Sequence, residues 1–149
     1  MAIKRIIKDI DINASAEKVW QVLFDDATYR IRAAEFMAGS YADTDRKEGS
    51  RVQFLGEDKS GIAGFISKNT PHEHLEITYD AFVGKGIEDT ESPEVQEFKW
   101  ATETYTLTEE NGVTHLHTEA DMDANWFDDM NTSRDRAMLK IKELSEQAV

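Results

Sequence analysis

The chain has 149 residues, of which 40% are hydrophobic and 32% are charged, and it contains no cysteine. This length and balance are typical of a soluble globular protein, and we expect one domain over residues 1–149. The lack of cysteine excludes disulfides, thiolate metal sites, iron–sulfur clusters and a cysteine nucleophile, and the formal net charge of −13 makes nucleic acid and anionic membranes poor partners.

The chain shows no pattern of a secretory leader or of a membrane span. The first residues lack the apolar core of a signal peptide, and no apolar run approaches the roughly 18 residues that a transmembrane helix needs. We therefore expect a cytoplasmic protein.

The N-terminal part of the chain changes from a strand pattern to a helix pattern. Residues 3–12 alternate between apolar and polar side chains, which predicts a strand. In the next segment, 13–24, apolar residues recur at helical spacing, and Ser15 can cap this helix by accepting a hydrogen bond from an amide of its first turn. Residues 26–37 predict one or two further short helical turns.

Further segments predict strands, and turn residues separate them. Asn111-Gly112 is the strongest hairpin signal, because both residues tolerate the positive φ angles of a tight turn. The predicted strands are 39–44, 50–56, 61–69, 73–83, 99–109 and 113–122. Together with residues 3–12 they make about seven strands.

Alternation within these strands predicts one covered face and one solvent face. Apolar side chains fall on a single face of 73–83 and of 113–122. In 99–109, Glu103 shares a face with Tyr105, which makes it a candidate for an inward-pointing carboxylate. Trp100 falls on the other face, unless a bulge turns it inward.

The longest irregular segment is 84–97, which we interpret either as a lid over a binding site or as a solvated acidic loop. Within it, Ser92-Pro93-Glu94 predicts the start of one helical turn.

A long final helix is predicted from Asn125, as its cap, to about Glu146. At 1.5 Å per residue it is roughly 30 Å long, enough to cross a small domain. Its inward stripe consists of Phe127, Met130, Arg134, Ala137, Met138, Ile141 and Leu144.

Four segments carry a resemblance to a known superfamily. They are the opening Ile-Asn-Ala-Ser-Ala-Glu-Lys-Val-Trp-Gln-Val-Leu at 12–23, Glu-Gly-Ser-Arg-Val at 48–52, Gly-Phe-Ile at 64–66 and Gly-Val-Thr-His-Leu at 112–116. Over essentially its whole length the chain resembles the START/Bet v1-like (SRPBCC) superfamily, and within it the branch of the Hsp90-ATPase-activator homologues. These motifs are caps, turn glycines and core positions, so no catalytic residue is carried over from the family.

This resemblance implies an α+β helix-grip fold. A seven-stranded curved antiparallel sheet would wrap around a long C-terminal helix, with two short helices after the first strand. Relatives with this fold include lipid and hormone carriers, polyketide cyclases, oxygenase domains and co-chaperone domains.

Motifs for metal or covalent chemistry are weak in this chain. His115 and His117 share a strand face with Glu119, and His74 or Glu76 on a neighbouring strand could supply a further metal ligand. That face is the predicted solvent side, so we interpret these histidines as solvated and expect no metal and no cofactor. The sequence contains no serine-nucleophile motif, phosphate-binding glycine loop or zinc-protease motif.

A helix gripped by a curved sheet leaves space for a small molecule, and we expect a cavity of a few hundred cubic ångströms there. Two charged candidates, Glu103 and Arg134, are predicted to face it. They could pair with each other, or Arg134 could hold a ligand carboxylate or extend to the rim. The candidate ligand-binding residues are Trp20, Phe24, Phe36, Leu75, Ile77, Tyr79, Glu103, Tyr105, Leu116, Trp126, Phe127, Met130, Arg134 and Met138.

We therefore expect a protein that binds a small, largely apolar ligand between the sheet and the C-terminal helix. Two alternatives stay open. A cyclase- or hydrolase-type enzyme would use Glu103, Tyr79 or Tyr105 as acid or base, and a strongly raised Glu103 pKa would favour it. A chaperone-interaction module would be favoured by an exposed apolar patch on the sheet. A protein partner or a homodimer is compatible with each of these functions.

Overall fold

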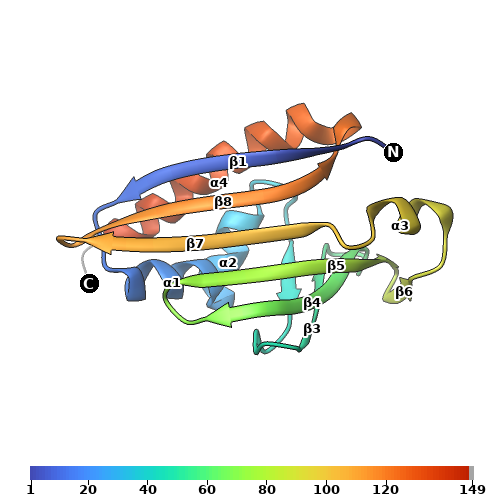
Figure 1. Ribbon diagram of the computed structural model, residues 1–149, viewed down its shortest axis with the longest axis horizontal. Coiled ribbons are helices and arrows are strands. Elements are labelled where there is room, and N and C mark those ends of the chain that lie inside the picture. Colours follow the sequence, from blue (N-terminus) through green and yellow to red (C-terminus); the bar gives the residue numbers. More distant parts are fainter. Residues whose placement is uncertain (148–149) are drawn as a thin grey trace.

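The computed structural model describes residues 1–147, and in it a curved antiparallel sheet wraps around a long C-terminal helix (Figure 1). The strands are β1 (Ile3–Ile12), β2 (Tyr41–Asp43), β3 (Arg51–Leu55), β4 (Gly61–Thr70), β5 (His74–Gly84), β6 (Ile87–Asp89), β7 (Thr102–Glu110) and β8 (Val113–Asp123). The helices are α1 (Ala16–Phe24), α2 (Asp26–Ala33), α3 (Pro93–Phe98), a 3₁₀ turn (Ala124–Trp126) and α4 (Phe127–Glu146). The helix-grip prediction is confirmed.

The sheet has the order β1-β8-β7-β5-β4-β3-β2, and β6 pairs with the end of β5. All of these pairs are antiparallel. Helix α4 follows β8 after the 3₁₀ turn and runs along β1 and β8 (Figure 1). Helices α1 and α2 contact α4 and lie on the same side of the sheet. The three helices thus cover the concave face.

The predicted faces of the strands are confirmed. Leu75, Ile77, Tyr79 and Ala81 of β5 are all buried, and the residues between them are half-buried. In β8 the buried residues are Thr114, Leu116, Thr118 and Ala120. Helices cover one face of these strands, so the alternation of apolar and polar residues in the sequence predicts which face is buried.

The N-terminal helices form as their sequence predicts. The Ser15 hydroxyl accepts a hydrogen bond from the Lys18 amide at 3.1 Å, so it caps α1 as expected. Val19 and Leu23 of α1 then pack fully buried into the core. Asn111 and Gly112 have φ angles of +53° and +79°, which confirms the tight hairpin between β7 and β8.

The link between α3 and β7 differs from the prediction. The strand predicted at 99–109 begins only at Thr102, because Trp100 adopts a φ of +75° and its amide bonds to the carbonyl of Tyr79. The indole of Trp100 is 61% exposed, so the suggestion that a bulge turns it inward is wrong.

The irregular segment predicted at 84–97 contains β6 and α3. The predicted helical turn is confirmed: the Ser92 hydroxyl accepts from the Val95 amide, and Val95 and Phe98 are buried. The ring of Phe98, just after this segment, lies 6.0 Å from that of Tyr79, so α3 is anchored to the sheet through Val95 and Phe98. Most other residues of 84–97 are exposed, and the choice between a lid and a solvated loop stays open.

Helix α4 is unbroken from Phe127 to Glu146, but the residue that caps the entry to it lies two positions before the predicted Asn125. The Asp123 carboxylate accepts from the Asn125 amide at 2.9 Å and starts a 3₁₀ turn, so Asn125 is not the cap. Phe127, Met130 and Leu144, which we expected to be buried, are half-buried. The buried residues of the helix are Arg134, Ala137, Met138, Ile141 and Ser145.

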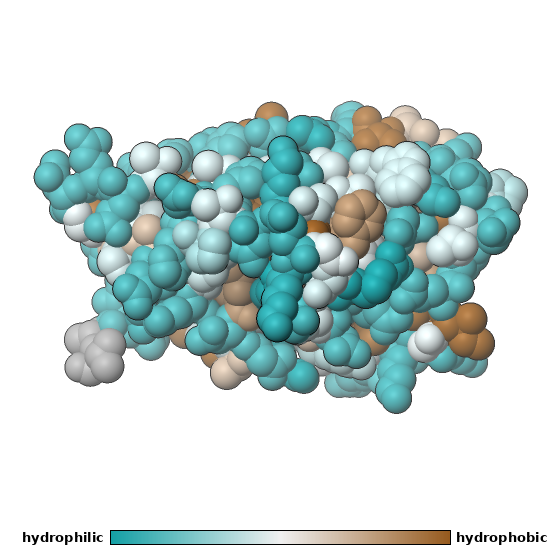
Figure 2. All heavy atoms as spheres, turned by 60° about the horizontal axis from the view of Figure 1, so that its bottom comes forward, coloured by the Kyte–Doolittle hydropathy of each residue, from teal (hydrophilic) through white to brown (hydrophobic). Residues whose placement is uncertain are grey.

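Figure 2 shows one face of the protein as largely hydrophilic, with small and separated apolar areas. Among residues 1–147, no helix is both long enough and apolar enough to cross a bilayer.

Gly64 allows β4 and β5 to approach closely beside a register shift, where Gly64 pairs with Tyr79. A Cβ atom at this position would lie 2.0 Å from the backbone oxygen of Thr78. We therefore predict that Gly64→Ala lowers the free energy of unfolding in urea by about 1–3 kcal/mol, because the strands must move apart. Gly84→Ala is the matched control, since a Cβ there meets nothing within 4 Å. Equal effects of the two substitutions would contradict this packing.

Candidate functional site

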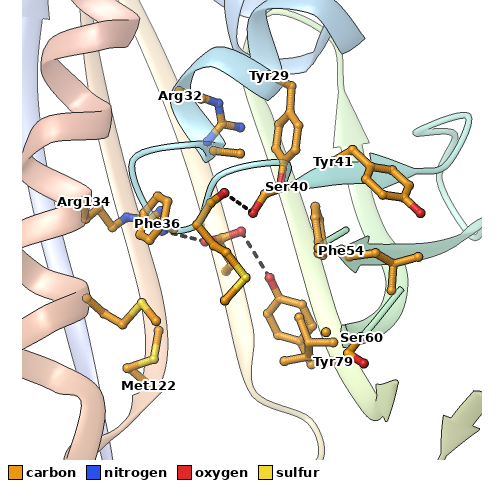
Figure 3. A pocket seen from close by; sticks show the side chains of 18 of the residues that line it. Tyr29, Arg32, Phe36, Ser40, Tyr41, Phe54, Ser60, Tyr79, Met122 and Arg134 are labelled. Carbon is orange, nitrogen blue, oxygen red and sulfur yellow. Dashed lines mark hydrogen bonds and ion pairs between the residues drawn. The ribbon is translucent and has the colours of Figure 1, made fainter. Parts of the chain in front are cut away.

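A cavity of about 300 Å³ opens between α2, α4 and the concave face of the sheet (Figure 3). Its walls come from α2, from the connection between α2 and β2, from six strands and from α4. The lining residues are Tyr29, Arg32, Ala33, Phe36, Met37, Ser40, Tyr41, Phe54, Leu55, Gly56, Ser60, Gly61, Ile62, Tyr79, Glu103, Tyr105, Met122, Met130 and Arg134. The cavity predicted from the sequence therefore exists, with a largely aromatic and aliphatic wall.

One side of the cavity is a row of aromatic rings. Phe54 stands between Tyr29 and Tyr79, with centroid distances of 6.1 Å to each. Phe98 supports Tyr79 from behind. These rings come from α2, β3, β5 and α3, so the wall depends on the whole fold and not on one local motif.

A charged pair crosses the cavity from the sheet to α4. Nη1 of Arg134 donates to Oε2 of Glu103 at 2.6 Å, and the hydroxyl of Tyr79 donates to Oε1 of Glu103 at 3.2 Å (Figure 3). The side chains of Glu103 and Arg134 are only 13% and 9% exposed. The pairing of Glu103 with Arg134, one of the predicted alternatives, is confirmed. Its role in selecting a ligand stays a prediction.

The electrostatics of this pair fix the protonation of its members. Burial alone would raise the pKa of Glu103, but attraction and hydrogen bonding from Arg134, assisted by Arg32 and Tyr79, outweigh burial and hold that pKa below its usual value. Burial, followed by the nearby Glu103 charge, raises the pKa of the Tyr79 hydroxyl well above its usual value. At neutral pH the site therefore presents a carboxylate bound by a guanidinium and a neutral phenol.

A second guanidinium, that of Arg32, lines the cavity and was not among the predicted residues. Arg32 is 5% exposed, and its Nε and Nη2 atoms donate to the carbonyl of Leu23 at 3.3 and 3.0 Å. Its Nη1 lies 3.4 Å from the hydroxyl of Tyr105. The signal was present in the sequence, because Tyr29, Arg32 and Phe36 have the i, i+3, i+7 spacing of one helical face.

The structure divides the predicted ligand-binding residues into two groups. Those that line the cavity are Phe36, Tyr79, Glu103, Tyr105, Met130 and Arg134. Those that do not are Trp20, Phe24, Leu75, Ile77, Leu116, Trp126, Phe127 and Met138.

Position within the fold explains the second group. Leu75, Ile77 and Leu116 belong to the core that α1 fills, so no space is left beside them. Trp126 is 57% exposed at the start of α4, and Phe127 is half-buried beneath the ammonium of Lys4.

The other three residues of that group lie beside different spaces. Trp20 and Phe24 of α1 line a separate, polar cleft. Met138 borders a void of about 10 Å³ between Arg32 and Arg134.

The histidines considered for metal binding lie on the outer face of β8. His115 contacts Asp11 at 2.7 Å and Asp9 at 2.8 Å, and His117 contacts Asp9 at 2.7 Å and Glu119 at 2.8 Å. Hydrogen bonds to these carboxylates raise the pKa of both histidines. Within residues 1–147, no three histidine or carboxylate side chains are arranged to hold a metal ion.

No protein-family model and no curated protein sequence matches the chain. Solved structures do match. Protein MLL2253 from Mesorhizobium loti superposes with a TM-score of 0.70 at 16% identity, over 95% of this chain and 96% of that one. The Aha1 dimer from Colwellia psychrerythraea gives 0.68 at 17% identity, over 96% of each chain. The chain has a Bet v1/SRPBCC-like fold.

A third similar structure is DynU16, described as a putative protein of the dynemicin biosynthetic locus. It superposes with a TM-score of 0.66 at 14% identity, over 96% of this chain and 47% of DynU16. At such identities the three similarities show the fold, and the chemistry of the site must be argued from its own residues.

We predict that Arg134→Met lowers the free energy of unfolding by roughly 3–5 kcal/mol, because the carboxylate of Glu103 is left buried without its partner. Adding Glu103→Gln should recover much of this loss, since the stranded charge is removed while the Tyr79 hydroxyl keeps an acceptor. The measurement is urea unfolding of the single and double variants.

The matched control is Arg136→Met on the same helix, whose guanidinium is 57% exposed and lies 3.9 Å from Glu35. A surface pair of this kind contributes about 0–1 kcal/mol. If Arg134→Met and Arg136→Met cost the same, the buried pair does not hold α4 on the sheet.

Proposed function

We propose that this protein binds a small, largely apolar molecule in the cavity between α2, α4 and the sheet. The observation that carries the proposal is the cavity itself, with a volume of about 300 Å³. This value lies at the lower end of the volumes typical of small-molecule sites. The predominantly apolar wall would gain roughly 25 cal/mol for each Å² of ligand surface that it removes from water.

An unfilled packing defect is a poor explanation for a space of this size. Protein interiors are close-packed, and voids larger than a water molecule are few in each domain. Here the space is bordered by rings that pack on one another and by a charged pair whose Glu103 oxygens both accept hydrogen bonds. These contacts support the wall independently of any ligand, as expected for a largely pre-formed binding site.

The geometry gives the enzymatic alternative less support. Glu103 has a lowered pKa, so it is a poor general acid, and its hydrogen bonds to Arg134 and Tyr79 weaken it as a base. The raised Glu103 pKa that would favour acid–base catalysis is thus not found. The likeness to DynU16 extends to the fold alone.

The chaperone-interaction alternative also lacks a specific observation. On the outer face of β1, the exposed side chains Ile3 and Ile7 are separated by Arg5, which forms ion pairs with Glu119 and Asp121 of β8. Charged groups therefore interrupt the apolar surface that a partner would need. The resemblance to the Hsp90-ATPase-activator branch stays a hypothesis about ancestry.

We predict saturable binding of the uncharged fluorescent probe N-phenyl-1-naphthylamine. Met130→Trp should weaken this binding by about tenfold or more, because the indole fills the space that the half-buried Met130 borders. The measurement is a fluorescence titration with the probe at fixed protein concentration.

Leu139→Trp is the matched control, since Leu139 is on the same helix but 61% exposed and outside the cavity. It should leave the affinity within about twofold. No saturable binding, or equal effects of the two tryptophans, would count against a ligand in this cavity.

A further inference from the structure

We propose that the ligand of this cavity is an organic anion, with an apolar body and a single carboxylate head, and that Arg32 binds the head. This inference rests on the proposed function and makes its ligand class specific. It is carried by the position of Arg32: a nearly buried guanidinium that lines the cavity and has only neutral oxygens as hydrogen-bond partners.

The hydrogen bonds of Arg32 leave part of its donor capacity unused. A guanidinium carries five N–H groups in a fixed planar fork. Arg32 directs Nε and Nη2 to the Leu23 carbonyl and Nη1 to the Tyr105 hydroxyl, the last at the long distance of 3.4 Å. Two of its N–H groups, one on each Nη atom, are therefore left for another acceptor.

No carboxylate compensates the charge of Arg32. Among the ion pairs within residues 1–147, the acidic partner at the cavity is Glu103, and it is paired with Arg134. Both oxygens of Glu103 are already engaged, one by Arg134 and one by Tyr79. Arg32 contributes to the attraction that lowers the pKa of Glu103, but it forms no ion pair with it.

A third guanidinium increases the local positive charge. Arg46 lies with its guanidinium carbon 5.1 Å from the centre of the Tyr29 ring, and that of Arg32 lies 4.6 Å from the same ring. Arg46 itself borders the neighbouring polar cleft, so among the residues that line the cavity two guanidiniums, those of Arg32 and Arg134, accompany one carboxylate, although the whole chain carries a formal charge of −13. The interior of the site thus has the opposite sign to the protein as a whole.

An anion is the ligand that completes this arrangement. A nearly buried guanidinium such as that of Arg32 needs compensation from an acceptor. The faces of Tyr29 and Tyr105 stabilise its charge by cation–π contact but accept none of its remaining N–H groups. A carboxylate matches two parallel N–H groups of a guanidinium and forms stronger hydrogen bonds than a neutral oxygen.

The other residues of the cavity determine which chemical character the body of the ligand must have. Arg32 and Arg134 reach the cavity from two helices, while Phe54 and Tyr79 form a wall without a free charge (Figure 3). Arg134 itself is engaged by Glu103, which leaves Arg32 as the guanidinium at this end without a carboxylate partner. A short aliphatic or aromatic monocarboxylate fits this division into a cationic end and an apolar end.

The test compares three ligands with the same eight-carbon chain: octanoate, 1-octanol and octylamine, at neutral pH by isothermal titration calorimetry. We expect octanoate to bind about tenfold or more tightly than 1-octanol, and octylamine to bind most weakly. Arg32→Met should remove the preference for octanoate while leaving 1-octanol within about threefold, because only the charged contact is lost. Arg136→Met, a surface guanidinium on α4, should change neither affinity.

The outcomes separate this inference from the proposed function. If 1-octanol binds as tightly as octanoate to the unmodified protein, the anionic preference is wrong, while the apolar cavity still binds ligand. If neither ligand binds or displaces the naphthylamine probe, both proposals fail. Should Arg32→Met not fold, Arg32→Gln is used, which removes the charge but keeps a hydrogen-bond donor: loss of the preference for octanoate supports the assignment to Arg32. Retention of that preference in either variant overturns it.

Discussion

The ion pair between Glu103 and Arg134 is the interaction on which the site depends. It joins β7 to α4 across a space that apolar side chains leave open, at 2.6 Å between Nη1 and Oε2. Two charges that are nearly buried need each other, because neither is solvated enough to stand alone. The pair therefore fixes the separation of helix and sheet and holds the Tyr79 hydroxyl in place. A purely apolar contact here would allow the helix to settle closer to the sheet and fill the cavity.

The balance of charges around the cavity is opposite in sign to that of the protein as a whole. The chain as a whole is strongly acidic, and its outer sheet face carries ladders of ion pairs such as that of Arg5 with Asp121. Around the cavity, guanidiniums outnumber carboxylates, and Arg32 has neutral partners only. Salt and water screen exposed charges much more than buried ones. The excess of positive charge around the cavity therefore has more influence on which ligand binds than the net charge of the whole protein.

The fold was predictable from the sequence because periodicity reports burial. Alternation in β5 and β8 gave the correct faces, the Ser15 cap and the Asn111-Gly112 turn were correct, and the final helix is unbroken. The candidate site was predictable only in part. The pairing of Glu103 with Arg134 could be predicted because both residues fall on inward faces of their elements. Arg32 was missed, because its helical spacing with Tyr29 and Phe36 indicates a shared face but not that this face borders a cavity. Leu75 and Leu116 were wrongly expected at the cavity. Alternation shows that a residue faces inward, but not whether α1 packs against it or a cavity lies beside it.

The most direct test of the account uses the methionine methyl groups as reporters of where a ligand sits. Of the five methionines, Met37, Met122 and Met130 line the cavity and Met1 lies outside it. In NMR spectra of protein labelled with ¹³C at the methionine methyls, the aromatic naphthylamine probe should shift the Met37, Met122 and Met130 signals through its ring currents and leave that of Met1 in place. Saturable binding that shifts Met1, or that leaves all three cavity methionines unchanged, would place the ligand elsewhere and contradict the account.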